Sequence, residues 1–561
     1  MTTIETQPSD TTSTAHHDAR PATAVFAAAA DWVTTTDHKK IGRLFAASGL
    51  LFLAGAAVVA ALLGLERADD SGTVIDADAL LQLVQVYRVG LIVAGLLPLA
   101  LGVAIAVAPA QVGARQIAFP RVALIGFYFW LAGVILTFAA LGNNGGIGGG
   151  HAQAVDQFLA GLGLAFVGLA AAALSVATTV LTARAPGMTM RRVPLFAWSS
   201  LIGALGVLLV VPVAFGNIVY LFVDHRLAVS ANFQGAEGIG AWLGWLFGVP
   251  AAIVFAIPAV GVAAELFPVT FKGRQQLRGV AFAGIALVGT AAFAALSQQS
   301  VIEVDLDRSQ KPGEFLDDLI PFLLFAGLPL LGLVIVLGLG GLTAQAGLLR
   351  NKRAGSAKPN LTPAFLFAFV GVGLVTLGVV ANALQALEDL GLLGTAFEEG
   401  ATLLVTYGAV LALVGGLVFW APKLCGVVVP AVHVVPLALL GAAGAVLAAG
   451  SAIVGGIVDQ PGGLPANDAG VAALFSLEFS GTAAALAVVG LVGHALVALT
   501  IVALGALVLK LLGAPAADQN PFGGHTLEWG GASPLPSDNY PVVPTVASAE
   551  PVFDLSYEGT L

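Results

Sequence analysis

Twelve long apolar segments limit what this chain can fold into more than any other feature does. Each has roughly 20 or more residues, the length that an α-helix needs to cross ~30 Å of membrane hydrocarbon. The segments are residues 42–64, 86–109, 121–142, 157–183, 194–222, 239–268, 277–297, 319–343, 362–386, 400–421, 427–457 and 484–512. Because 58% of the residues are hydrophobic and only 10% are charged, a soluble globular protein is excluded. The sequence predicts an all-α membrane protein with twelve transmembrane helices.

The basic residues predict how these helices are oriented. If the N-terminus lies in the cytoplasm, the loops and tails on that side receive eighteen of the 23 Lys and Arg residues. The other side receives Arg67, Arg88, Arg226, Arg308 and Lys311. Since the cytoplasmic loops of membrane proteins are enriched in Lys and Arg, both termini are predicted to be cytoplasmic.

The loops predicted on the opposite side are acidic, at residues 301–318, 387–399 and 457–470. Together with the formal net charge of -10, they argue against nucleic acid as a partner, because binding to phosphates needs Lys and Arg. The simplest interpretation is that these loops are solvated. The alternative is a docking surface for an external domain or a basic electron carrier.

The chain divides into three parts by composition. Residues 1–30 are polar and rich in Thr, without the apolar core of a secretory signal, and are predicted to be a disordered cytoplasmic arm. Residues 31–513 form the membrane domain, and residues 514–561, rich in Pro and Gly, form a cytoplasmic C-terminal tail. Cys425 is the only cysteine, which excludes a disulfide framework and a thiolate metal cluster.

Five motifs carry a resemblance to a known family. They read DWVTTTDHKKIGRLF (31–45), PAQVGARQIAFPR (109–121), RAPGMTMRRVPLFAW (184–198), VFWAPKLCG (418–426) and NPFGGHTLEWGGASPLP (520–536). In this order they resemble segments of the heme-copper oxidase subunit I family, the catalytic subunit of cytochrome c oxidase. The resemblance implies the twelve-helix arrangement of that family and a place in the plasma membrane of a bacterium.

The resemblance also implies where cofactors would be held. The family binds two hemes and one copper ion through six histidines on helices two, six, seven and ten. Counted from the motifs, the heme-ligand positions of the family fall on Tyr87, Gly400 and Thr402. Gly and Thr are not useful heme ligands, whereas a tyrosine can ligate ferric heme. Tyr87 therefore leaves heme binding open, although a phenol near a membrane interface is the commoner role.

The copper-ligand positions of the family fall on Val249, Gln298 and Gln299. Valine has no donor atom, and carboxamides are poor copper ligands compared with imidazole. We therefore expect this chain to bind neither the two hemes nor the copper ion of the family, and to carry no catalytic residue.

The positions that carry protons in the family are also replaced. The glutamate that ends one proton pathway falls on Ala251, and the tyrosine that is cross-linked to a copper ligand falls on Ile253. The lysine of the second pathway falls near Thr343, and the asparagine of the first falls near Ser175. Residues 455–463 lack the arginine pair that would bind heme propionates.

Two histidines within the predicted spans, His433 and His494, are the remaining candidates for a rebuilt heme site. Their predicted depths in the membrane differ by roughly 6 Å, but in the family arrangement their helices do not face one heme. The expected role of each is a bond to a backbone carbonyl or a hydroxyl. We expect the space of the missing hemes to close through Gly and Ala contacts, or to hold lipid or quinone, because an empty cavity is costly.

Three functions are compatible with these residues. The favoured one is a non-catalytic member of the family, a structural or docking subunit that contacts membrane lipid and respiratory partners, such as a subunit II-like protein or a genuine subunit I. The alternative is an active terminal oxidase that couples electron transfer to oxygen with proton pumping. The second alternative is a transporter or channel that reuses the fold, with polar intramembrane side chains lining its path.

Overall fold

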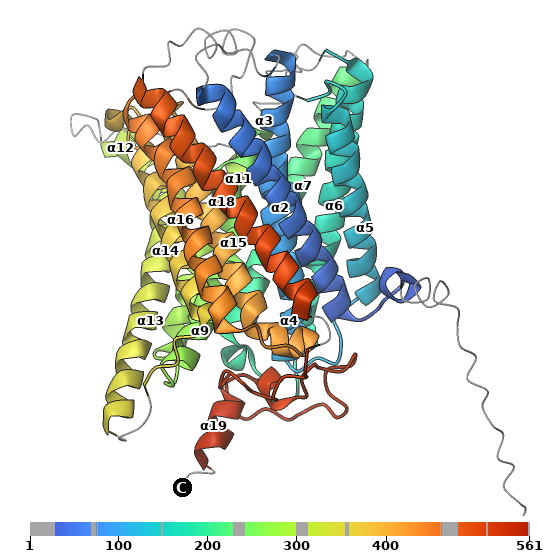
Figure 1. The fold of residues 1–561 in the computed structure, drawn as a ribbon, viewed down its shortest axis with the longest axis vertical. Coiled ribbons are helices and arrows are strands. Elements are labelled where there is room, and N and C mark those ends of the chain that lie inside the picture. Colours follow the sequence, from blue (N-terminus) through green and yellow to red (C-terminus); the bar gives the residue numbers. More distant parts are fainter. Residues whose placement is uncertain are drawn as a thin grey trace, which may run out of the picture.

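The computed structural model describes most of the chain. The described residues are 29–68, 75, 77–146, 150–227, 242–298, 304, 312–353, 358–460, 462, 481–511 and 514–558. Within them, twelve helices are long and apolar enough to cross a membrane, and they lie side by side in one bundle (Figure 1). The predicted all-α fold with twelve transmembrane helices is therefore confirmed. The arm predicted at residues 1–30 lies outside the described residues, except for residues 29 and 30.

The twelve spans follow one another along the chain, and four of them combine several helical segments. The first is α2 (His38–Ala68), and the second combines α3 (Ala77–Leu91), the π-helix η1 (Ile92–Leu96) and α4 (Leu97–Gln111). The next three are α5 (Pro120–Leu141), α6 (Ala152–Thr182) and α7 (Leu195–Leu227).

The second half of the bundle continues in the same way. The sixth span combines η4 (Gly244–Phe247) with α9 (Val249–Thr270), the seventh combines α10 (Arg278–Val288) with α11 (Ala291–Ser297), and the eighth combines α12 (Pro312–Phe322), η5 (Leu323–Gly327) and α13 (Leu328–Arg353). The last four are α14 (Pro363–Gln385), α15 (Ala396–Cys425), α16 (Ala431–Ile457) and α18 (Gly481–Leu511).

Small residues allow neighbouring helices to approach closely. A Cβ atom placed on Gly42 of α2 would lie 2.5 Å from the carbonyl oxygen of Gly102 in α4. A Cβ atom on Gly161 of α6 would lie 2.8 Å from the backbone nitrogen of Thr137 in α5. Because packing rather than hydrophobicity drives helix association in lipid, these glycines are where the backbones come into contact.

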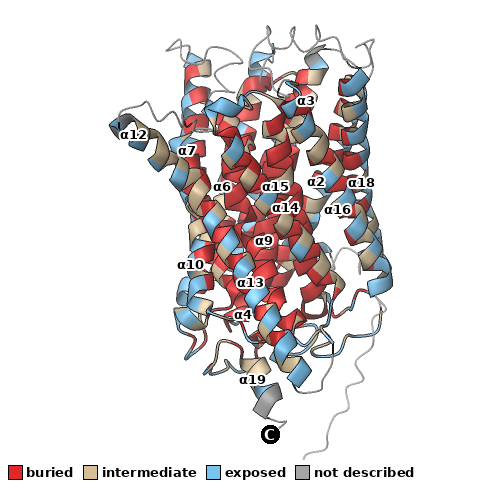
Figure 2. Cartoon of the chain, turned by 90° about the vertical axis from the view of Figure 1, so that its left-hand side faces the viewer, coloured by how far each residue is buried: buried red, intermediate tan, exposed pale blue. Residues whose placement is uncertain are grey.

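Burial follows the position of each helix in the bundle (Figure 2). Helices α4 and α9 lie at the centre, and every residue of both is buried. Helices α13 and α16 lie at the periphery, where only 33% of the most apolar part of each is buried. The exposed leucines and valines of these outer helices form the surface that faces lipid.

The C-terminal tail packs across one end of the bundle (Figure 1), which we call the tail face. The ammonium of Lys423, at the end of α15, donates a 2.7 Å hydrogen bond to the carbonyl of Gly531. The Tyr540 hydroxyl donates a 2.7 Å bond to the carbonyl of Ala110 in α4. The tail therefore closes the ends of two central helices, which its Pro- and Gly-rich sequence alone did not predict.

Candidate functional site

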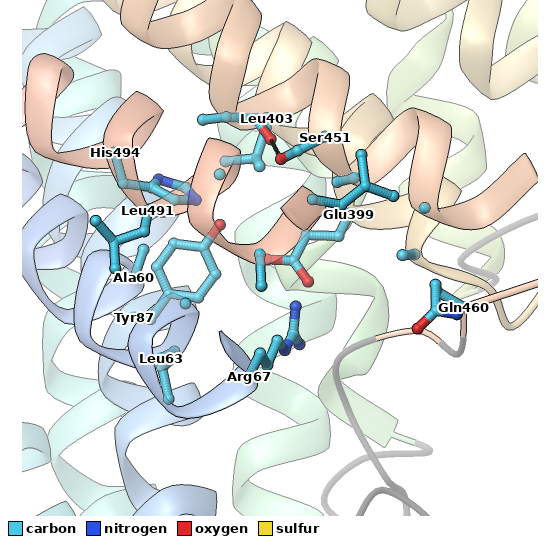
Figure 3. A pocket seen from close by; sticks show the side chains of 18 of the residues that line it. Ala60, Leu63, Arg67, Tyr87, Glu399, Leu403, Ser451, Gln460, Leu491 and His494 are labelled. Carbon is cyan, nitrogen blue, oxygen red and sulfur yellow. Dashed lines mark hydrogen bonds between the residues drawn. The ribbon is translucent and has the colours of Figure 1, made fainter. Parts of the chain in front are cut away.

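A cavity of about 100 Å³ lies near the end of the bundle that is opposite the tail face. Helices α2, α3, α15, α16 and α18 form its walls (Figure 3). Its ionisable lining side chains are Arg67, Tyr87, Arg88, Glu399 and His494. We call it the distal cavity. It is the place where charged groups from helices far apart in the sequence meet.

The two arginines of the distal cavity are half-buried. Neither the Arg67 nor the Arg88 guanidinium forms a hydrogen bond or a direct ion pair with any residue that the structure describes. Both guanidiniums interact electrostatically with the Glu399 carboxylate across the cavity. The three charged groups therefore line one cavity, and no direct ion pair between them fills it.

Two phenols and an imidazole continue the cluster toward the middle of the membrane. The Tyr87 hydroxyl lies near the Glu399 carboxylate but is buried without a hydrogen bond of normal geometry. The Tyr87 and His494 rings meet edge to face, with their centroids 6.0 Å apart. The His494 Nδ1 atom lies 2.8 Å from the Tyr407 hydroxyl. The prediction that His494 bonds a hydroxyl is confirmed, whereas His433 is exposed in the first turn of α16.

These residues do not fit a heme. Cofactor sites usually have volumes of about 300–1,000 Å³, and the distal cavity has about 100 Å³. A Cβ atom on Gly400 would lie 2.7 Å from the backbone nitrogen of Ile453, so α16 occupies the space beside that position. Tyr87 and His494 are in contact with each other, which leaves no room for an iron atom and its porphyrin between them.

The positions predicted to correspond to copper ligands do not fit that metal. Val249 is 3% exposed and packs in the apolar core. The Gln298 side chain accepts a 2.8 Å hydrogen bond from the Asn217 carboxamide, and Gln299 lies outside the described residues. Among the residues that the structure describes, no group of three or more His, Cys, Asp or Glu side chains could hold a metal ion.

The remaining predicted positions make local contacts. Ala251 and Ile253 are fully buried in the apolar core. The Thr402 and Ser175 hydroxyls donate to carbonyls of their own helices, at 2.9 Å and 3.0 Å. The Thr343 hydroxyl accepts a bond from the Gln276 backbone nitrogen. Of all the positions taken from the resemblance, Tyr87 is the one that lines the distal cavity.

The meeting of Arg67, Arg88 and Glu399 was not predicted from the sequence. Glu399 was expected in an acidic loop, but α15 begins at Ala396, so Glu399 lies in the first turn of that helix. A signal was present, because Thr395 and Glu398 have the spacing of a capping box. The Thr395 hydroxyl accepts from the Phe397 nitrogen, and the Glu398 carboxylate accepts from the Gly394 nitrogen.

A second polar cluster lies at the tail face, around Glu528. One oxygen of this carboxyl group accepts hydrogen bonds from Gln111, Trp420 and Thr526, at 3.2, 3.0 and 2.8 Å. Burial raises the pKa of Glu528 above its ordinary value, and the three bonds oppose this shift. We call these four residues the tail-face cluster. It joins the tail to the ends of α4 and α15.

Comparison with known proteins identifies relatives of the first half of the chain. Residues 40–297 match the family described as Cytochrome C and Quinol oxidase polypeptide I. A putative cytochrome c oxidase subunit 1-beta of Streptomyces avermitilis is 32% identical over 257 residues, which are 43% of this chain and 45% of that protein. Cytochrome c oxidase subunit 1 of Bacillus subtilis is 28% identical over 260 residues, 44% of this chain and 42% of that protein. Each match therefore spans less than half the length of the relative.

Proposed function

Because this chain belongs to the heme-copper oxidase subunit I family, we propose that it is a non-catalytic structural or docking subunit of a respiratory membrane complex. The observation that carries this proposal is the distal cavity. Tyr87, the first heme-ligand position taken from the resemblance, contacts His494 and faces Glu399 there. The space beside Gly400 is occupied by Ile453, so a chain of this shape can keep the fold without the cofactors.

The proposed subunit contacts lipid along its outer helices and binds other respiratory subunits, such as a subunit II-like protein or a genuine subunit I. It lies in a bacterial plasma membrane, with both termini cytoplasmic. The distribution of 23 Lys and Arg residues, eighteen on one side, supports this orientation. The N-terminal end of α2 and the C-terminal tail lie at the same end of the bundle (Figure 1), which agrees with this orientation.

The second candidate is an active terminal oxidase. The relatives named cytochrome c oxidase subunit 1 favour it. The residue types at Gly400, Thr402, Val249 and Gln298 oppose it, since none of them supplies an imidazole.

One experiment separates the two candidates. The full chain, purified from membranes, is measured by reduced-minus-oxidised absorption spectroscopy and by metal analysis. We expect no heme bands, and iron and copper far below one atom per chain. Heme bands at stoichiometric levels would overturn the non-catalytic proposal and favour the active oxidase.

A second measurement tests the docking role. The tagged chain is isolated from native membranes after mild solubilisation, and the bound proteins are identified. We expect stoichiometric respiratory subunits. A chain isolated alone, which moves a solute when reconstituted in vesicles, would instead support the transporter alternative.

A further inference from the structure

The side chains that line the distal cavity carry more positive than negative charge; the Glu398 carboxylate, which also interacts with Arg88, does not line it. The formal charges of the lining side chains Arg67, Arg88 and Glu399 sum to +1. The guanidiniums make no hydrogen bond or direct ion pair within the described part of the chain. Each guanidinium is half-buried and interacts with Glu399 without a direct bond, so part of the cost of taking it out of water is not offset. A negatively charged group in the cavity would offset that cost.

We propose that the distal cavity binds a small monovalent carboxylate between Arg67 and Arg88. The planar guanidinium of arginine presents paired N–H donors that match the two oxygens of a carboxylate. One added negative charge neutralises the sum of the three lining charges. The Tyr87 hydroxyl lines the same cavity and is buried without a hydrogen bond of normal geometry, so it is a further donor for the ligand.

The volume of the cavity sets the size of the ligand. An engineered apolar cavity of about 150 Å³ holds a benzene molecule, whereas the distal cavity has about 100 Å³. A quinone ring is therefore too large. The apolar lining residues Leu63, Val84 and Leu403 suit a short alkyl group, so acetate and propionate are the expected sizes. This inference is independent of whether the subunit is catalytic.

The helices around the cavity explain why the site would be stable. Gly64 of α2 packs against Leu491 of α18, and a Cβ atom on this glycine would lie 3.1 Å from the Leu491 Cβ atom. Arg67 lies one turn beyond Gly64 in α2, while Arg88 and Glu399 come from α3 and α15. Three separately held helices therefore fix the three charges, and the ligand does not have to order them.

The test measures the binding of acetate to the full chain in detergent, in a buffer without carboxylates or phosphate, by isothermal titration calorimetry. We expect one saturable site for acetate and for propionate, and none for the neutral isostere acetamide. Replacing one arginine, in Arg88→Gln or Arg67→Gln, should weaken acetate binding at least about tenfold, since a charge-assisted bond is lost. Glu399→Gln should tighten it about tenfold, because a repelling carboxylate is removed.

Two controls keep the proposal open to refutation. Arg121→Gln changes an exposed arginine at the start of α5 and should leave acetate binding unchanged. Tighter binding by Glu399→Gln cannot result from misfolding, so this variant protects the test if an arginine variant is unstable. Absence of acetate binding by the wild type would overturn the proposal. Equal binding of acetamide, or tighter binding of decanoate than of acetate, would also overturn it.

Discussion

The two polar clusters at opposite ends of the bundle differ in how their charges are satisfied. In the tail-face cluster, three donors from two helices and the tail converge on one oxygen of Glu528. In the distal cavity, the Arg67 and Arg88 guanidiniums make no such bond with any described residue. A bonded buried network stabilises the fold, whereas unbonded groups keep their capacity to bind something else. We infer that the tail end serves stability and the distal end serves recognition.

The largest effect is expected at the tail-face cluster. Glu528→Ala removes the acceptor and leaves the Gln111, Trp420 and Thr526 donors buried without partners. Breaking such a network typically costs about 4 kcal/mol. We expect this loss in the free energy of unfolding, measured in detergent, together with faster proteolysis of the tail.

The matched control is Glu528→Gln, which keeps an acceptor oxygen and nearly the same volume. It should cost about 1 kcal/mol. If both variants were as stable as the wild type, the tail-face cluster would have no structural role. The contrast between the tail-face cluster and the distal cavity would then fail.

An acid-dependent effect of intermediate size is expected in the tail. The His525 side chain is 5% exposed and packs on Phe553, with ring centroids 4.4 Å apart. Burial, and then the nearby Arg350 and Arg274, lower the pKa of His525 to about 3. In the unfolded chain this pKa is ~6.5. The unfolded state therefore binds the proton more readily, so the contribution of His525 is complete above pH 6.5 and is lost as the pH falls toward 3.

By pH 5 this loss should reach about 2 kcal/mol. The buried carboxyls of Glu528 and Glu550 act in the opposite direction, because burial raises the pKa of each. His525→Phe keeps a ring against Phe553 and isolates the histidine contribution. The stability of the wild type relative to this variant should fall between pH 6.5 and pH 5. A difference that does not change with pH would contradict the prediction.

The fold could be predicted from hydropathy because each transmembrane helix corresponds to one continuous apolar run in the sequence. An apolar run such as 362–386 matches α14, Pro363–Gln385, closely, since membrane helices satisfy their backbone bonds within one segment. The packing of the tail could not be predicted in this way. Its bonds, such as that from Tyr540 to Ala110, join residues far apart in the sequence and follow no periodicity.

The distal cavity could not be predicted from the sequence for a similar reason. Arg67 and Arg88 were two of the five basic residues predicted on one side of the membrane, and Glu399 was predicted to lie in a loop. Their meeting depends on how α2 and α3, in the first two spans, lie relative to α15, the tenth span. His494 was correctly predicted to lie within the last span. Predicting that Tyr407 is its partner would have required the position of α15 relative to α18.

A smaller effect is expected between the two ends. Tyr407→Phe removes the hydroxyl that lies 2.8 Å from the His494 Nδ1 atom and leaves that nitrogen without its bond. The expected loss is about 1.5 kcal/mol in the free energy of unfolding. A double-mutant cycle with His494→Phe should recover most of this value as coupling. Zero coupling would show that the pair contributes nothing to stability.

The smallest effect on stability is expected from Tyr87→Phe, and it is the sharpest test of the contrast. The Tyr87 hydroxyl forms no hydrogen bond of normal geometry, so its removal should change the free energy of unfolding by about 0.5 kcal/mol or less. The same variant should weaken acetate binding severalfold, because a donor that faces the ligand is lost. A stability loss as large as that of Tyr407→Phe, with unchanged acetate binding, would make Tyr87 a structural residue. The distal end would then be built like the tail end, and its two arginines would need another explanation.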